Sequence, residues 1–545
     1  MCLLVRGSTG TRGDSNMFAR STHLAWLVMC LVTVSAEAQF RKAPPGMFKE
    51  LDDVIVGNAL IIHGKQLFID DHVVEEMTGV RKVLNQPVKH PRNPVLRKSA
   101  SEHAIDFGTV VHDSRDGLFK MWYQIWGPGE AVGIVGYAVS KDGVNWNKPI
   151  IDKSAGTNLV TFEPAEPWVS APGVIIDEQE TDPRRRFKML YSARPLKRAS
   201  LSSCAAYSSD GIHWKQDSQN PLIPYSDTQI APYWDQRLSR YVAYLRTGPP
   251  NIRQIARIES TDFRHWSPKL TVIPGKSRLG GTISKLDRPF GTNHYTMTAM
   301  PYAGVYVGLL NTYHGETHKP IPDDKLWMDR VDAQLVFSRN GVTWQRVLKD
   351  GAITAAQLRE DRNWKLAAEQ ATFLPYGEFK KDWDWGQIYP HHPPLVVGDE
   401  IRFYYAGISG RHWSAEHKDT PDHAIGLATL RLDGFVSVET ERKGTLTTRP
   451  IVFLGDTLVV NANAKGGSLT VEALDTRGRV IKRFGADDCV PITTDNIRHV
   501  VKWKGLKDCQ LLQGRPIRLR FHLAHAKLYS FEPGIRRKHY LQSYD

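Results

Sequence analysis

Short hydrophobic runs rich in aromatic and β-branched residues recur along most of this chain, and each is bounded by polar residues and glycine. Such runs are typical of β-strands, because side chains of these shapes pack well on a pleated surface. Five of the runs resemble one another and each follows a polar turn: Phe119–Tyr123, Phe187–Tyr191, Tyr241–Tyr244, Val305–Leu309 and Ile401–Tyr405. The pattern therefore predicts a chain built mainly of β-strands.

A second series of similar segments consists of turns. Ser140–Trp146, Ser208–Trp214 and Ser338–Trp344 share the pattern Ser-x-Asp/Asn-Gly-x-x-Trp, and Ser260–Trp266 differs by having Phe in place of Gly. In such a turn the Asp or Asn side chain bonds to its own backbone, Gly takes a positive φ, and Trp enters the next strand as an apolar anchor. Each copy predicts the corner of a β-hairpin, and Leu432–Phe435 is a degenerate fifth copy.

The two series keep the same order, with one strand marker and one turn in each unit of roughly 50 to 80 residues, as in a β-propeller. We therefore predict an all-β fold with a five-bladed β-propeller over residues 101–440. An ordinary β-sandwich with chance similarity among its turns is the alternative. Residues 39–100 are expected to be a lead-in segment that packs on the propeller. The short alternating strands after residue 440 predict a C-terminal β-sandwich over 441–545.

The first 38 residues resemble a secretory signal peptide. Arg20 precedes an apolar run from Leu24 to Val34, and small residues in an A-x-A arrangement follow it, so we expect cleavage after Ala38. The run is too short to span a bilayer. We therefore expect a secreted or periplasmic protein without a membrane anchor; either Met1 or Met17 could be the start.

Charge and cysteine content narrow the function further. The chain of 545 residues carries a formal charge of +13, but its basic residues are scattered and form no nucleic-acid-binding motif. A solvated surface is the simplest interpretation, and attraction to an anionic polysaccharide is the alternative. No Cys/His spacing resembles a zinc site, and we expect no metal and no cofactor. Cys489 and Cys509 could form a disulfide in an oxidising compartment.

Acidic residues stand near the start of the inferred innermost strand of each blade, where propeller geometry directs side chains into a central funnel. Cleavage of a glycosidic bond needs one carboxylic acid and one carboxylate, so these acids are candidate catalytic residues. In chain order they are Glu102, Asp106, Glu163, Asp227, Asp287 and Asp384, with Glu166 beside Glu163. Sugar rings could stack on nearby aromatic residues, and the candidate substrate-binding residues are Trp168, Trp383, Trp385 and His391.

With its repeated turns, five units and appended strand-rich region, the chain resembles the superfamily of five-bladed propeller glycoside hydrolases that contains families 32 and 43, especially divergent exported bacterial members. The resemblance implies a hydrolase acting on a poly- or oligosaccharide. It also implies an Asp on the first blade, matched by Asp106, an orienting Asp on a middle blade, matched by Asp227, and a general acid Glu. The candidates for that Glu are Glu163, Glu166 and Glu369, and the chain lacks the Trp-x-Asn-Asp-Pro-Asn-Gly and Arg-Asp-Pro strings.

Two other functions stay open. A sialidase-like enzyme is one, because the repeated turn resembles the sialidase aspartate box, although there Gly follows Asp by two positions. The other is a propeller that binds carbohydrate without cleaving it. The sequence leaves the sugar, the linkage, the stereochemical outcome and the oligomeric state open.

Overall fold

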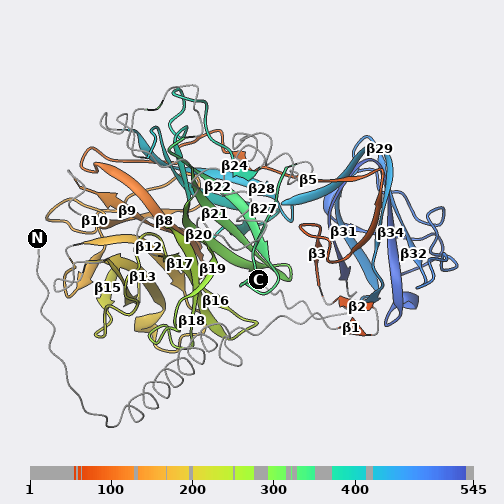
Figure 1. Cartoon of the computed structure of the whole chain (residues 1–545), viewed down its shortest axis with the longest axis horizontal. Helices are drawn as coiled ribbons and strands as arrows, with labels where there is room; N and C mark the ends of the chain where they lie inside the picture. Colours follow the sequence, from red (N-terminus) through yellow and green to blue (C-terminus); the bar gives the residue numbers. More distant parts are fainter. Residues whose placement is uncertain are drawn as a thin grey trace, which may run out of the picture. The chain divides into compact units, whose positions relative to one another are not determined.

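The computed structural model of the chain describes residues 55–56, 59–62, 64–127, 133–166, 168–194, 201–248, 252–274, 293–314, 321, 328–349, 371–412 and 421–534. Strands dominate these ranges (Figure 1), and η2 (Pro183–Arg185) and η5 (Gln510–Leu512) are short 3-10 helices. The predicted all-β character is therefore confirmed here. The expected signal peptide lies outside the described residues. None of the helices in the described ranges is long and apolar enough to cross a bilayer.

From residue 104 to residue 431 the strands follow one another in mainly antiparallel groups (Figure 1). The first group contains β8 (Ala104–Asp113), β9 (Leu118–Trp126) and β10 (Gly133–Ser140). The second contains β11 (Thr161–Glu163), β12 (Val169–Ile176), β13 (Phe187–Ala193), β14 (Ser202–Ser208) and β15 (His213–Gln216). The third contains β16 (Ala231–Asp235), β17 (Arg240–Thr247), β18 (Gln254–Ser260) and β19 (Leu270–Ile273).

The strands that follow belong to one larger sheet. In chain order they are β20 (Asn293–Tyr302), β21 (Val305–His314), β22 (Arg330–Ser338), β23 (Gln345–Arg346), β24 (Thr372–Leu374), β25 (Gln387–Pro390), β26 (Leu395–Val397), β27 (Glu400–Ile408) and β28 (His423–Arg431). A parallel pairing of Val331 with Gln387 joins β22 to β25. The antiparallel strands β20 to β24 and β25 to β28 are therefore joined into one sheet by this single pairing.

Contacts between the groups close a ring. β8 contacts β12, β12 contacts β16, and β16 contacts β20; β20 contacts β21, β21 contacts β25, and β25 contacts β8. Residues that precede the ring in sequence complete its last sheet, since β6 (Val88–Lys89) and β7 (Leu96–Arg97) pair antiparallel with β28. The sheets form a curled array, and the outer strands of the last sheet come from residues that precede the first sheet. This arrangement fits the predicted β-propeller.

The repeated turns have the hydrogen bonds that their sequence predicts. Ser208 Oγ accepts a hydrogen bond from the Gly211 backbone N–H at 2.9 Å, and Gly211 has a φ of 79°. Asp210 Oδ1 accepts from the two backbone N–H groups that follow Gly211, at 2.8 and 2.9 Å. The turns beginning at Ser140 and Ser338 repeat these bonds. Local chemistry therefore fixes each turn.

Three turns are also bonded to a neighbouring sheet. The second strand of one group supplies an aromatic donor to the glycine carbonyl of another group's turn: Trp122 to Gly211 at 2.6 Å, Tyr244 to Gly341 at 2.8 Å and Tyr404 to Gly143 at 2.7 Å. The turn that has Phe263 in place of glycine forms an apolar contact instead, since Phe263 belongs to the same buried cluster as Leu190. Leu190 stands in the strand series where Trp122 stands in the first group.

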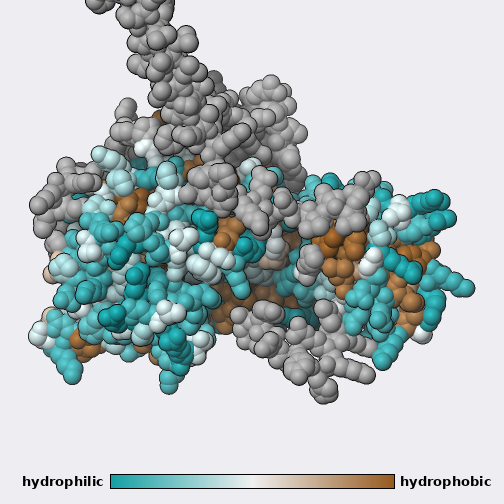
Figure 2. Space-filling model, turned by 90° about the horizontal axis from the view of Figure 1, so that it is seen from below, coloured by the Kyte–Doolittle hydropathy of each residue, from teal (hydrophilic) through white to brown (hydrophobic). Residues whose placement is uncertain are grey.

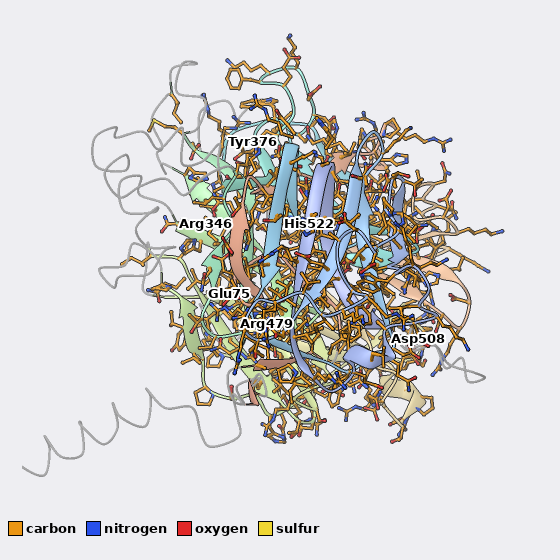
Figure 3. The ribbon with its side chains drawn as sticks, turned by 90° about the vertical axis from the view of Figure 1, so that its right-hand side faces the viewer. Glu75, Arg346, Tyr376, Arg479, Asp508 and His522 are labelled. Carbon is orange, nitrogen blue, oxygen red and sulfur yellow. The ribbon has the colours of Figure 1, made fainter. Side chains whose placement is uncertain are left out.

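The remaining strands form a second β-rich part around the long strand β34 (Pro516–Gly534). Figure 3 labels Glu75 on β4. Its Oε1 atom accepts a hydrogen bond from Nη2 of Arg518 on β34 at 3.0 Å. The other strands of this part are β1 (Ile55–Val56), β2 (Ala59–Ile62), β3 (Gln66–Leu67), β4 (Val74–Thr78), β5 (Arg81–Leu84), β29 (Val436–Thr448), β30 (Ile451–Phe453), β31 (Thr457–Asn463), β32 (Ser468–Leu474) and β33 (Asp495–Val500).

The face of the molecule seen in Figure 2 is mainly hydrophilic, with a few hydrophobic patches.

The two cysteines of this part do not form the disulfide considered from the sequence. Cys489 and Cys509 are both buried and free. The Cys489 sulfur accepts a hydrogen bond from the Val471 N–H at 3.3 Å, whereas the Cys509 N–H donates to the Asp456 carbonyl at 2.8 Å. Burial raises the pKa of the Cys509 thiol to about 12. Both residues are therefore inert core thiols held by different neighbours.

Candidate active site

Bulges near the beginning of three first strands direct side chains toward one region. The pairing register shifts between Ile105 and Gly108 in β8, and between His294 and Met297 in β20. A third shift lies between Ser170 and Gly173 in β12. A bulge bends its strand and re-aims the side chains of the extra residues. The re-aimed residues include Asp106, Phe107 and Tyr295.

Asp106 is a buried carboxyl group in the first of these bulges. Asp106 is only 7% exposed, and its Oδ1 atom has no hydrogen-bond partner among the residues that the structure describes. Burial raises the pKa of Asp106 to about 7, although a hydrogen bond from the Trp126 indole lowers the pKa. At neutral pH this carboxyl group is therefore divided between its acid and its carboxylate form.

Asp227 precedes β16 and has the opposite electrostatic environment. Arg246 on β17 binds it in a bidentate pair, with Nε 2.7 Å from Oδ1 and Nη2 in contact with Oδ2. Burial raises the pKa of Asp227, but the hydrogen bonds and charge of Arg246 outweigh burial and leave the pKa below its ordinary value. Asp227 is half-buried and stays ionised at neutral pH.

Tyr295 on β20 connects the two carboxyl groups. Burial is the largest cause that raises the pKa of its hydroxyl; the charges of Arg246 and Arg253 lower this pKa, and the smaller effects of Asp106 and Asp227 raise it. The Arg246 guanidinium lies 4.7 Å from the centre of the Tyr295 ring, and Tyr389 on β25 lies 5.4 Å from it. We call the region bounded by these five residues the mouth. The sequence prediction paired Asp106 with Asp227, and the structure brings both beside one tyrosine.

Of three other predicted acids, two have structural contacts and one is exposed at the edge of a sheet. Glu102 is buried, accepts a hydrogen bond from the Tyr123 hydroxyl at 2.8 Å and is paired with Lys148. Glu163 is exposed on β11, at the edge of the second group. Asp384 is buried between Lys89 at 2.5 Å and the Tyr405 hydroxyl at 2.8 Å, so it anchors β6. Asp287 and Glu369 lie outside the described residues.

Glu166, the remaining acid considered from the sequence, lies beside an aromatic pair. Burial raises its pKa, while a hydrogen bond from the Trp168 backbone N–H lowers it. The Trp168 ring is 6.4 Å from the Trp126 ring, which in turn bonds Asp106. Glu166 is therefore connected to Asp106 through Trp168 and then Trp126.

The other predicted binding residues differ in exposure. Trp168 is half-buried, with the Arg194 guanidinium 5.4 Å from its ring centre. Trp383 is half-buried, whereas Trp385 is buried against Phe379. His391 is buried; its ring would lie 2.9 Å from a Cβ atom at Gly108, so it fills the interior of the ring of strands. Burial lowers its pKa to about 3, which keeps its imidazole neutral at neutral pH.

Several residues in the mouth or beside it were not predicted from the sequence. Trp126 and Arg246 come from second strands, which the sequence argument treated as scaffold, and Tyr295 comes from a first strand searched only for acids. The one available signal was the position of Tyr295 just before the Val305–Leu309 strand marker. Within the described ranges, His, Cys, Asp and Glu form no group of three or more that could hold a metal ion.

Comparison with solved structures adds named neighbours. A glycoside hydrolase described as putative, from Bacteroides ovatus, matches at 16% identity over 64% of this chain and 97% of its own, with a TM-score of 0.41. A family 32 β-fructofuranosidase from Bombyx mori matches at 11% identity over 82% of this chain and 96% of its own, with a TM-score of 0.38. Both of these solved structures carry glycoside hydrolase names.

A further match comes from work on family GH130, whose mannoside phosphorylases are described as including glycoside hydrolases that target β-1,2 mannosidic linkages in Candida mannan. It shares 13% identity over 64% of this chain and 94% of its own, with a TM-score of 0.40. No protein-family model and no curated protein matches the chain.

Proposed function

We propose that this chain is an exported glycoside hydrolase that cleaves a glycosidic bond of a poly- or oligosaccharide in the mouth. In this proposal the antiparallel groups between residues 101 and 440 are the five blades of a propeller, and the C-terminal strands form a β-sandwich. The observation that carries the proposal is the pair Asp106 and Asp227. Two carboxyl groups act on one tyrosine, and their surroundings move their pKa values in opposite directions.

The two environments assign different roles. Asp106, with a pKa of about 7, keeps a substantial protonated fraction at neutral pH and donates its proton to the leaving glycosidic oxygen. Asp227 stays anionic beside Arg246 and supplies the negative charge that an oxocarbenium-like transition state requires. Whether Asp227 attacks the sugar or activates a water depends on the separation of the reacting carboxyls, which is about 5 to 5.5 Å for retention and about 6.5 to 9.5 Å for inversion.

Glu166 is the third acid of the proposal. The family resemblance implies a Glu as the residue that donates this proton, and Glu166 matches that Glu better than Glu163 does, because Glu166 is half-buried and its pKa is raised, whereas Glu163 is exposed. Glu166 is therefore the alternative donor to Asp106, from the side of the mouth next to Trp126 and Trp168. A Glu166→Gln variant that loses turnover with Asp106 and Asp227 intact would support this role.

The experiment that tests the function measures release of sugar from a panel of plant, algal and yeast oligosaccharides. Asp106→Asn and Asp227→Asn should each lower turnover by about 10²- to 10⁴-fold, because an amide neither donates that proton nor supplies the charge. Glu163→Gln is the matched control, since it removes an exposed carboxylate at the edge of the second group, and it should keep full activity. Full turnover in both Asp variants would refute the assignment.

A further inference from the structure

One buried glutamine joins the two chain segments that carry the acids of the mouth. β8 carries Asp106, and residues 225–230, which precede β16, carry Asp227. Gln229 is 1% exposed, and its Nε2 atom donates a hydrogen bond to the Gly108 carbonyl at 3.1 Å. Among the residues that the structure describes, this is the only hydrogen bond between the two segments. Each end of the bond is a residue that stands two positions after an acid.

The Gly108 carbonyl lies at the end of the bulge that directs Asp106 toward the mouth. The pairing register of β8 shifts just before Gly108, and Asp106 is one of the residues in the shifted stretch. The same carbonyl accepts a hydrogen bond from the His392 backbone N–H at 3.1 Å. A carbonyl oxygen has two lone pairs, so Gln229 and His392 together satisfy it. The Gln229 side chain therefore completes the hydrogen bonding at the end of this bulge.

The segment before β16 has a strained backbone that is held by other parts of the fold. Tyr225 and Thr228 have φ angles of 53° and 62°, a region that residues with a Cβ atom rarely adopt. Lys269 Nζ donates to the Tyr225 carbonyl at 2.8 Å, and Ser192 Oγ on β13 donates to the Thr228 carbonyl at 3.0 Å. Gln229 adds the hydrogen bond to β8. The segment is thus fixed from three directions.

The amide of Gln229 is not the side chain that stability alone would favour. Its Oε1 atom is buried and has no hydrogen-bond partner among the described residues. An unsatisfied buried acceptor is destabilising, whereas an apolar side chain of similar size would leave no such atom. What leucine could not supply is the donor to the Gly108 carbonyl. The glutamine therefore indicates a need for this hydrogen bond rather than for packing.

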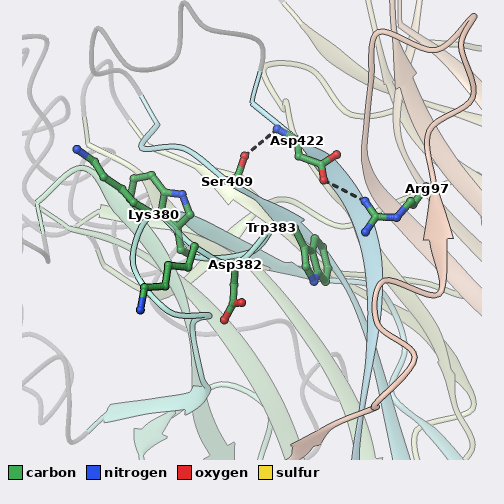
Figure 4. A pocket seen from close by; sticks show the side chains of 8 residues that line it. Arg97, Lys380, Asp382, Trp383, Ser409 and Asp422 are labelled. Carbon is green, nitrogen blue, oxygen red and sulfur yellow. Dashed lines mark hydrogen bonds and ion pairs between the residues drawn. The ribbon is translucent and has the colours of Figure 1, made fainter.

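Other loops around the ring are also joined by side chains, and the comparison is informative. In the pocket of about 630 Å³ that Trp383 lines, Ser409 Oγ accepts from the Asp422 backbone N–H at 2.7 Å (Figure 4). In the same pocket Arg97 Nη1 is 3.1 Å from Asp422 Oδ2. These contacts hold the two ends of the loop between β27 and β28 to each other and to β7. The Gln229 bond differs because a candidate catalytic acid stands close to both of its ends.

We infer that Gln229 is the positioning residue that sets the separation between the Asp106 and Asp227 carboxyl groups. That separation decides between retention and inversion, and a small misplacement of a reacting group lowers turnover strongly. Gln229 acts through the two backbone segments, since it is almost completely buried. The inference rests on the proposed function for the reaction, but the separation of the two carboxyls can be measured without a substrate.

The test replaces Gln229 in the full-length protein. Gln229→Leu keeps a side chain of similar size and removes the donor. Crystal structures of the native protein and this variant should differ by about 1 Å in the separation of the two carboxyls, and kcat should fall by about 10²-fold with KM unchanged. The urea midpoint should stay close to the native one, because the substitution also removes the unpartnered Oε1 atom.

Gln229→Glu is the conservative variant. Its protonated carboxyl group has an O–H donor for the Gly108 carbonyl, whereas its carboxylate has none. The ratio of its kcat to the native kcat should therefore rise toward one as pH is lowered, and the ratio for Gln229→Leu should stay low. Dividing by the native kcat at each pH removes the titration of Asp106 and Asp227 themselves. If Gln229→Leu does not fold, a Gln229→Glu ratio that does not change with pH would overturn the inference.

The matched control is Gln86→Leu. Gln86 is half-buried between β5 and β6, and its Nε2 atom also donates to a backbone carbonyl, that of Thr372 at 2.9 Å. This variant should keep the native kcat and carboxyl separation. An unchanged separation in Gln229→Leu, its full turnover of a substrate that the native protein cleaves, or an equal loss in Gln86→Leu would refute the role of Gln229. If the native protein cleaves no sugar, the proposed function fails, and the measured separation still decides this inference.

Discussion

The burial of Asp106 predicts that Asp106→Asn changes how stability depends on pH. The folded protein holds the Asp106 proton up to a pKa of about 7, whereas the unfolded chain releases it near the ordinary value of 3.8. Between these two values the folded state binds more protons, so the free energy of unfolding falls as pH rises. Each unit of pKa difference corresponds to about 1.4 kcal/mol, so the native protein loses about 4 kcal/mol across this window.

The asparagine variant has no proton to release and should not show this loss. Urea unfolding of the native protein and of Asp106→Asn at pH 5 and pH 8 measures the effect. Between pH 5 and pH 8, the free energy of unfolding of the variant should rise by about 3 kcal/mol relative to that of the native protein. This follows because about two of the pH units between the ordinary pKa of 3.8 and the folded pKa of about 7 lie above pH 5. Glu163→Gln, at an exposed carboxylate, should show the same offset at both pH values.

Two results would refute this reasoning. A constant difference between Asp106→Asn and the native protein would mean that the Asp106 carboxyl ionises normally in the folded state. A variant that loses stability at pH 8 would mean that the ionised carboxylate is stabilised by partners. In either case the proton-donating role proposed for Asp106 would lose its physical basis.

Three further outcomes are expected. The kcat/KM of the native protein should fall as pH rises through about 7, because the proton donor Asp106 must be protonated; a pH–rate profile that rises there contradicts the assignment. In urea unfolding, Gly211→Ala should destabilise the protein by about 2 kcal/mol more than Gly156→Ala. Both glycines have a positive φ, but only at Gly211 would the added Cβ atom meet a side chain, the Trp122 ring at 2.6 Å. Trp214→Ala should cost about 3 to 5 kcal/mol, since this residue is 2% exposed; a loss under 1 kcal/mol would contradict its anchoring role.

The sequence was most informative where structure depends on neighbouring residues. The turn at Ser208 is closed by its own serine and aspartate side chains and by a glycine with positive φ, and each of these requirements is visible in seven consecutive letters. The strand markers follow from the shapes of their own side chains. For the same reason the all-β character and the order of strands and turns could be predicted from the chain alone.

The sequence predicted Asp106 and Asp227 as candidate acids but not their surroundings. They were predicted because they stand near the starts of inferred strands. Glu102 and Asp384 satisfied the same criterion, and only the structure shows that Lys148 and Lys89 hold them in place. An acid with a distant partner cannot be distinguished by sequence from an acid without one.

Tertiary structure alone decided three features: the aromatic and basic wall around the two carboxyls, the completion of the last sheet by β6 and β7, and the absence of a bond between Cys489 and Cys509. Each depends on residues far apart in the chain. Tyr295 and Arg246 reach the mouth because bulges and strand pairings bring them there, and a raised pKa arises from the water that these neighbours exclude. Local residues specify turns and strands, whereas burial and charge pairing are properties of the packed molecule.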